Sequence, residues 1–83
     1  MRVHIHPHAR ERMQERGADE EEIMATLERG EQFKARFGRV GFRPNFPFNK
    51  ERRGRLFATK QVELYAIQEN DAWVVITVLT RFF

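Results

Sequence analysis

Three side chains near the N-terminus recur at a spacing of four, namely His8, Arg12 and Arg16. If this segment is a helix, the spacing places them on one face. A neutral imidazole is well suited to moving protons at neutral pH, and guanidinium groups bind phosphate and stabilise the charge that develops in phosphoryl transfer. The spacing therefore fits a site that cleaves phosphodiesters. It also fits a structural role in which both arginines pair with Glu20 or Glu21, and spacing alone favours that role.

Three further polar candidates lie in segments that otherwise read as extended and apolar: Lys60, Thr77 and Arg81. Thr77 and Arg81 are four apart and share one face of a strand, because side chains alternate in direction along extended backbone. Polar groups inside so apolar a strand need partners. They fit the lining of a site or, more simply, an ordinary strand-forming threonine and a solubilising arginine.

The central third of the chain combines positive charge with aromatic rings. Residues 31–60 hold nine basic and two acidic side chains, hence a net charge of +7 in a chain whose total is +3. Basic residues contact phosphates and aromatic rings stack on unpaired bases, so the segment predicts RNA binding. The alternatives are an acidic protein partner, a solvated loop, or phenylalanines that belong to the core. The candidate nucleic-acid-binding residues are Arg39, Arg43, Lys50, Arg52, Arg53 and Arg55, interleaved with Phe42, Phe46, Phe48 and Phe57.

No metal or other cofactor is expected. His4 and His6 would share a strand face, but no carboxylate or cysteine close by completes a ligand set, and Pro7 interrupts the geometry before His8. The chain has no cysteine, which excludes disulfide scaffolds and thiolate metal sites.

The first third of the chain predicts two helices. The first follows Pro7, which suits an opening helical turn, and runs over about 8–16 to Gly17. The second covers 19–29, with Asp19 and Glu22 forming a capping box. Gly30 ends the second helix, and residues 2–6 predict a short strand or an extended lead-in.

The rest of the chain predicts three or four antiparallel strands. Alternation over 33–37 indicates a half-buried strand, and two prolines in 42–48 argue against a regular central strand there. Asn70 and Asp71 supply the turn of a hairpin between strands 62–68 and 73–81, the last of which is apolar on both faces and so expected in the middle of the sheet. The residues expected to be buried are Ile23, Leu27, Val62, Leu64, Val74, Ile76 and Val78.

The 83 residues predict a single domain, 1–83, with a thin core to which a partner chain, such as a second copy in a homodimer, would add stability. No apolar run approaches the roughly 20 residues that span a bilayer. The N-terminus lacks the apolar stretch of a signal peptide. We therefore expect a cytoplasmic protein without membrane contact.

The run HARERMQERGADEEEI, from His8 to Ile23, resembles the H-A-x-x-R-M-x-x-R-G-[IV]-[ST]-x-x-[ED]-[IV] opening of the domain-of-unknown-function 4258 family. The run VVITV at 74–78 is similar to the final strand of that family. Two positions depart from the pattern: Ala18 replaces a branched apolar residue, and Leu79 stands where an aromatic residue is common.

This family is grouped with RelE-like toxins and related small metal-independent ribonucleases. The resemblance implies an α+β fold with two N-terminal helices packed on a curved antiparallel sheet of three to four strands. It also implies ribonuclease or toxin activity, or descent from it, with characteristic polar positions at His8, Arg12, Arg16 and Thr77. A ribose 2′-hydroxyl would attack its neighbouring phosphate, with His8 as general base or acid and the arginines, joined by Lys60 or Arg81, holding the phosphate.

Two hypotheses follow. The first is a RelE-like toxin that acts on RNA, alone or at the ribosome, as a metal-independent endoribonuclease or its degenerate relative, with an acidic antitoxin as protein partner. The second is a non-catalytic RNA-binding or protein-interaction module that uses the basic segment 34–60. Convergence of His8, Arg12 and Thr77 on an open cleft would favour catalysis. Pairing of Arg12 and Arg16 with carboxylates of the second helix would favour the binding module.

Overall fold

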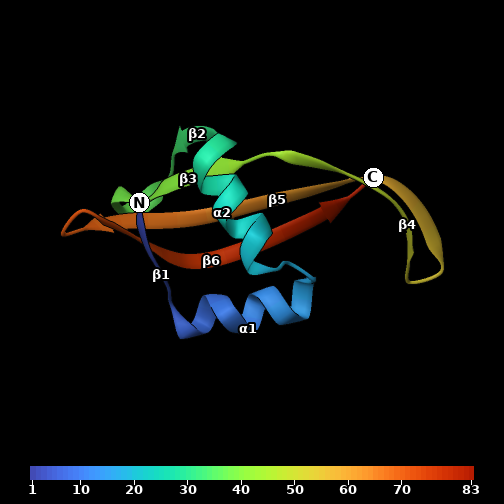
Figure 1. Cartoon of the computed structure of the whole chain (residues 1–83), viewed down its shortest axis with the longest axis horizontal. Helices are drawn as coiled ribbons and strands as arrows, with labels where there is room; N and C mark the ends of the chain where they lie inside the picture. The colour runs from blue at the N-terminus through green and yellow to red at the C-terminus, as the bar shows by residue number, and fades with distance from the viewer.

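The computed structural model describes residues 1–83 and places two helices against a six-stranded sheet (Figure 1). The fold class is α+β, as expected, but the sheet has more than the three or four strands that the sequence predicts. The elements are β1 (Arg2–Ile5), α1 (Pro7–Arg16), α2 (Glu20–Arg29), β2 (Glu31–Lys34), the 3₁₀ turn η1 (Arg36–Gly38), β3 (Val40–Arg43), β4 (Asn45–Arg52), β5 (Arg55–Glu69) and β6 (Ala72–Phe82).

Both helices begin and end where the sequence indicates. Pro7 lies in the first turn of α1, and Gly17 ends that helix with a left-handed backbone at φ 73°, which glycine adopts without steric cost. At the start of α2 the Asp19 carboxylate accepts a hydrogen bond from the Glu22 N–H, and the Glu22 carboxylate accepts one from the Asp19 N–H. The predicted capping box is therefore confirmed.

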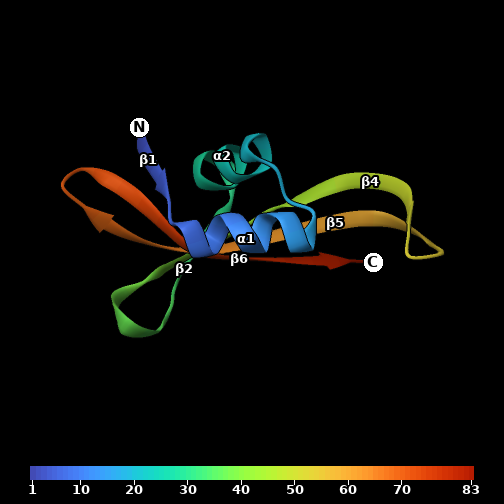
Figure 2. The same cartoon turned by 90° about the horizontal axis from the view of Figure 1, so that it is seen from below.

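The strands run in the order β1-β6-β5-β3-β2, and β4 pairs with β5 outside this path. β1 is parallel to β6 and every other pair is antiparallel, so the expectation of a purely antiparallel sheet is wrong at this edge. β1 covers β6 only over residues 72–75. Beyond them α1 lies alongside β6 (Figures 1 and 2). The last strand is thus central at its start and flanked by a helix afterwards.

The middle of the chain departs most from its sequence pattern. β2 ends at Lys34, and the strand expected over 33–37 is cut short because Phe37 has a left-handed backbone at φ 62°. Residues 45–52 form a strand although they include Pro47. β4 pairs on one side only, where a missing N–H is tolerated, and its register shifts between Pro47 and Lys50.

β4 and the start of β5 extend beyond the end of β6 as a hairpin (Figures 1 and 2). We call residues 45–58 the basic arm. None of these residues is buried, whereas β5 buries Lys60, Val62, Glu63, Leu64 and Ala66 farther along. The same strand therefore serves the core in its middle and faces solvent at its start.

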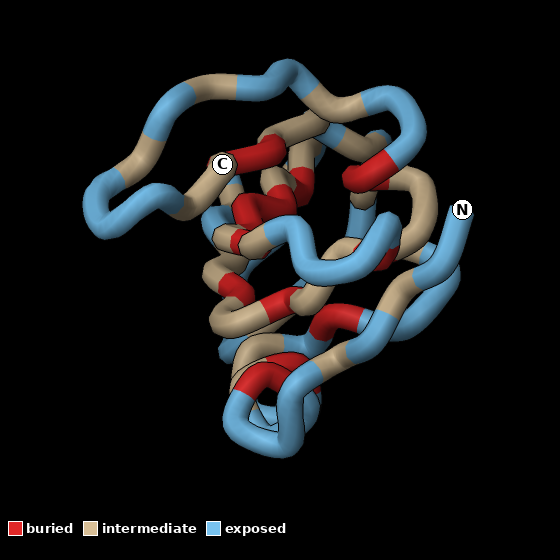
Figure 3. The backbone as a smooth tube through the Cα atoms, turned by 90° about the vertical axis from the view of Figure 1, so that its left-hand side faces the viewer, coloured by how far each residue is buried: buried red, intermediate tan, exposed pale blue.

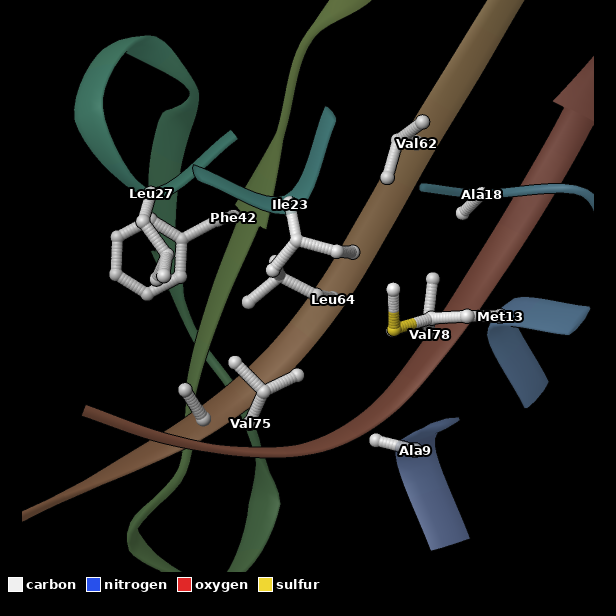
Figure 4. Close-up of a cluster of buried hydrophobic side chains, with 11 residues drawn as sticks. Ala9, Met13, Ala18, Ile23, Leu27, Phe42, Val62, Leu64, Val75 and Val78 are labelled. Carbon is white, nitrogen blue, oxygen red and sulfur yellow. The ribbon is translucent and has the colours of Figure 1, made fainter. Parts of the chain in front are cut away.

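The helices cover one face of the sheet, and the core lies between the two layers (Figures 2 and 4). Buried stretches are short along the whole chain, with 16 of 83 residues buried, as expected for so small a domain (Figure 3). The core consists of Ala9, Met13, Ala18, Ile23, Leu27, Phe42, Val62, Leu64, Ala66, Val75 and Val78. Burial is confirmed for Ile23, Leu27, Val62, Leu64 and Val78.

Two expected core residues of β6 are not buried. Tyr65 pairs with Thr77 and Ala66 pairs with Val75, so Ile76 is an extra residue that bulges from the ladder. The bulge shifts the alternation, and Val75 rather than Val74 packs in the core with Val78 (Figure 4). The expected burial of Val74 and Ile76 is therefore wrong; both are half-buried.

The other face of the sheet carries no helix (Figure 2). Its side chains include those of β5 that alternate with the core residues, such as Glu63 and Tyr65. We call this the open face. Neither helix of the fold is long and apolar enough to cross a membrane.

Candidate functional site

The stripe His8, Arg12 and Arg16 is largely engaged in local contacts. His8 is exposed, and its backbone N–H donates to Nδ1 of His6 at 3.1 Å. The Arg12 guanidinium pairs with Glu15 of the same helix at 2.8 Å. Arg16 donates from Nη1 to the carbonyl oxygen of Val78 at 2.6 Å, which joins the end of α1 to β6. Neither arginine pairs with a carboxylate of α2.

Lys60 lies on the covered side of the sheet. It is 7% exposed, and its Nζ donates to the carbonyl oxygen of Gly17 and pairs with Glu22 Oε1 at 2.8 Å. Glu22 also completes the capping box of α2. Lys60 therefore joins β5 to the turn between the helices, and its ammonium group is occupied by these two acceptors.

Thr77 and Arg81 lie on the opposite, open face, because Thr77 pairs with Tyr65 and Arg81 contacts Glu63. The structure thus divides the candidate catalytic residues between two sides of the sheet and the outside of α1. It does not bring the whole set together in one cleft. Thr77 and Arg81 share the open face, Arg16 and Lys60 secure the helices, and His8 and Arg12 lie on α1.

A cluster that the sequence analysis missed lies on the open face. Glu63 is only 5% exposed although no helix covers it. Its carboxylate pairs with Arg43 at 3.3 Å and Arg81 at 3.5 Å, and it accepts a hydrogen bond from the Tyr65 hydroxyl. That hydrogen bond, aided by burial, raises the pKa of Tyr65 above its ordinary value. We call these four residues the Glu63 cluster.

The signal for this cluster was present in the sequence. Glu63 stands between Val62 and Leu64, which both point into the core, so its side chain had to point to the other face. A carboxylate in the interior of a long strand needs cationic partners. The sequence does not say which cations supply them, because Arg43 and Arg81 lie 20 and 18 residues away.

The basic arm holds cations of another kind. Four basic residues, Lys50, Arg52, Arg53 and Arg55, form no ion pair with any carboxylate. Three of them lie over rings: Arg52 over Phe82 at 4.5 Å, Arg55 over Phe57 at 5.4 Å and Lys50 over Phe48 at 5.8 Å from the centroid.

A hollow of about 330 Å³ opens among these side chains. Its lining consists of Arg52, Arg53, Arg55, Phe57 and Phe82. The turn at its rim places Arg53 and Gly54 at positive φ, 52° and 80°. Cations without partners beside aromatic rings suit phosphate groups and stacked bases.

The candidate nucleic-acid-binding residues therefore separate into three groups. Lys50, Arg52, Arg53 and Arg55 share the arm. Arg43 is engaged with Glu63, and Arg39 follows the η1 turn at the opposite end of the sheet. The continuous basic segment of the sequence is thus not one surface in the fold.

Residues 5–80 match the family described as "Domain of unknown function (DUF4258)". The chain belongs to the DUF4258 family. No curated protein and no solved structure matches it. The DUF4258 match spans both helices, the basic arm and the Glu63 cluster apart from Arg81, so the resemblance drawn from the two ends of the chain extends over nearly all of it.

Proposed function

We propose that this DUF4258 protein is a RelE-like, RNA-directed cytoplasmic protein that binds single-stranded RNA through the basic arm. The observation that carries the proposal is the set of arm cations without carboxylate partners, packed against rings around an open hollow. By contrast, Lys60 and Arg43, which lie over the body of the sheet, have carboxylate partners. Two helices on one face of a curved sheet agree with the RelE-like part of the proposal.

The mixture of charge and rings favours RNA over an acidic protein. Carboxylates of a protein would need only the cations, whereas unpaired bases also use the faces of aromatic rings. Phe48 and Phe57 both pack against Phe82, so the arm holds a small aromatic cluster near its cations. An acidic antitoxin would act in this proposal by occupying the same cations.

The test is fluorescence anisotropy of a labelled single-stranded RNA over a series of salt concentrations. Binding should weaken steeply as salt rises, because each phosphate contact releases condensed counterions. The double variant Arg52→Glu, Arg53→Glu should lower affinity about tenfold or more and flatten the dependence of log K on log salt by about 1 per lost contact.

The matched control is Arg2→Glu with Arg29→Glu, which changes the net charge equally at two exposed residues outside the arm. Its affinity for RNA should stay close to that of the wild type. Equal losses of RNA affinity in the two double variants would show that net charge, and not the arm, determines binding. Absence of RNA binding at low salt would rule out the proposal altogether.

RNA cleavage is a second candidate, favoured by the Glu63 cluster. In such a reaction the 2′-oxygen bonds to phosphorus as the bond to the 5′-oxygen breaks, a base takes the 2′-proton and an acid protonates the leaving oxygen. The Tyr65 hydroxyl would be the acid, since it lies beside both arginines, and Arg43 and Arg81 would stabilise the charge on the phosphate. His8 stays a separate sequence-based candidate for proton transfer, because it lies on α1 and not with the Glu63 cluster.

The two candidate acids can be tested separately. With chelator present, wild-type protein should cut a mixed RNA, and either Tyr65→Phe or His8→Ala should slow cutting by about 10²–10⁴-fold, the usual effect of losing a general acid or base. Tyr65→Phe keeps the ring that packs edge-on against Phe33 at a centroid distance of 6.1 Å. If both variants cut RNA at the full rate, neither residue is the general acid or base. If the wild type cuts no RNA, cleavage is excluded and RNA binding is the only proposal that remains.

A further inference from the structure

The β2–β3 turn presents Phe37 to solvent in a costly conformation. The residue is 87% exposed and has a left-handed backbone at φ 62°, ψ 36°. A bulky residue with a side chain on Cβ avoids this region, which glycine and asparagine adopt more easily. Neither the exposure of the ring nor its backbone favours folding. A strained, exposed aromatic residue of this kind points to a function outside the fold.

The surroundings of Phe37 indicate what the ring meets. Lys34, Arg36 and Arg39 flank it and form no ion pair with a carboxylate. A hollow of about 430 Å³ lies between the turn and the open face, lined also by Phe33, Tyr65 and Thr77. The Thr77 hydroxyl makes no hydrogen bond within the fold. The site thus offers rings, cations and a free hydroxyl in one open pocket.

We infer that the β2–β3 turn is a second nucleobase site, at which Phe37 stacks on an unpaired base of the RNA strand bound by the arm. Lys34, Arg36 and Arg39 contact the flanking phosphates, and the Thr77 hydroxyl meets polar groups at the edge of the base. This inference rests on the proposed function of the arm. It is carried by separate residues, so the two can fail independently.

β6 connects the two sites. Thr77 lines the hollow beside the turn, on the open face. Leu79 and Thr80 line another hollow of about 480 Å³, shared with Arg52 and Arg53 and also with Glu15 and Arg16 of α1, so this hollow lies on the helix side of β6. From Thr77 to Phe82, in the arm hollow, is five residues of extended strand, roughly 17 Å. An RNA strand that occupies both sites therefore passes from one side of β6 to the other, and binding at one site raises the effective concentration at the other.

The experiment compares Phe37→Asn and Phe37→Trp with the wild type by anisotropy, using a mixed-sequence RNA of about 16 nucleotides, a length within the range that single-strand binders cover. Phe37→Asn should lower affinity by about 5- to 100-fold, the loss of one stacked base. Its melting temperature should not fall, because asparagine tolerates the left-handed backbone. Phe37→Trp should keep the affinity, and RNA should quench its added emission over the background of Trp73.

The control is Asn70→Gly in the β5–β6 turn. Asn70 also has a positive φ, 48°, and lies at a turn of the same sheet without lining either hollow. This variant should bind RNA as the wild type does. An equal loss in both variants would show a general effect of altered turns and would overturn the inference.

Three other outcomes are decisive. If Phe37→Asn binds RNA normally while the arm double variant does not, the second site is wrong and the arm proposal stands. If wild-type protein binds no RNA, both the arm proposal and the second site are wrong. If Phe37→Asn loses affinity for poly-glutamate but not for RNA, the turn binds an acidic protein and the nucleobase assignment is overturned.

Discussion

The core of the sheet and the basic arm place similar residues in opposite situations. In the core, Lys60 of β5 is buried and paired with Glu22, and Leu64 lies opposite the fully buried Phe42 of β3. On the arm, Lys50 of β4 has no carboxylate partner, and Phe48 is only half-buried. Burial of a cation requires a partner, whereas an exposed cation does not. The difference shows which charges hold the fold together and which stay available to a ligand.

The largest expected effect is the difference in stability lost when an aromatic ring of the core or one of the arm is removed. Phe42→Ala should lower the free energy of unfolding by about 3–5 kcal/mol, because it empties a fully buried site that packs edge-on against Trp73 at a centroid distance of 5.1 Å. Phe48→Ala should cost less than about 1.5 kcal/mol, since the ring is half-buried. Urea unfolding measures both, with Phe42→Leu as a milder variant should the alanine variant not fold. Equal losses of unfolding free energy in the two variants would show that the arm unfolds together with the core.

The second-largest expected effect is the difference in stability lost when Lys60 or Lys50 is replaced. Lys60→Ala leaves Glu22, whose side chain is 19% exposed, without its cation, and should cost about 2–4 kcal/mol. Lys50→Ala on the arm should change stability by no more than about 0.5 kcal/mol. Conversely, Lys50→Ala should weaken RNA binding while Lys60→Ala, under conditions where it is folded, should not. If Lys60→Ala is as stable as the wild type, the proposed difference between paired and free cations is wrong.

The smallest effect concerns pH and the open face. The folded-state pKa of Tyr65 is raised by its hydrogen bond to Glu63, so the stabilisation is complete below the unfolded pKa of about 10 and is lost as pH rises through the higher folded value. The free energy of unfolding should therefore fall above about pH 10, and fall less in Tyr65→Phe. Because Tyr65 is the chain's one tyrosine, its ultraviolet titration reports this group alone. Identical pH profiles for the two proteins would contradict the proposed coupling.

Local signals predicted the parts of the fold that depend on neighbours in sequence. The capping box of Asp19 and Glu22, the glycine at position 17 and the Asn70-Asp71 turn each act within a few residues, and the structure confirms all three. The parallel pairing of β1 and the bulge at Ile76 depend on partners far along the chain. For that reason alternation alone assigned Val74 to the core in place of Val75.

The candidate site was predictable in composition but not in arrangement. The basic segment was evident, yet only the fold shows that Lys60 and Arg43 are paired while the arm cations are free. The spacing of His8, Arg12 and Arg16 predicted a shared helical face, but not that Arg16 donates to the backbone of β6. Ion pairs between distant residues are decided by tertiary structure, which spacing cannot encode.

The edge formed by β1 also determines the order in which the chain folds as it is synthesised. Arg2 pairs with Ala72, and the N–H of His6, just before α1, donates to the carbonyl oxygen of Val75 at 2.9 Å. The helix pair and the β5–β6 hairpin close over short loops, whereas this contact spans 70 residues and costs more chain entropy. Residues 2–5 must therefore wait until residues 72–75 have been synthesised, and we expect β1 to dock after the helix pair and the β5–β6 hairpin have formed.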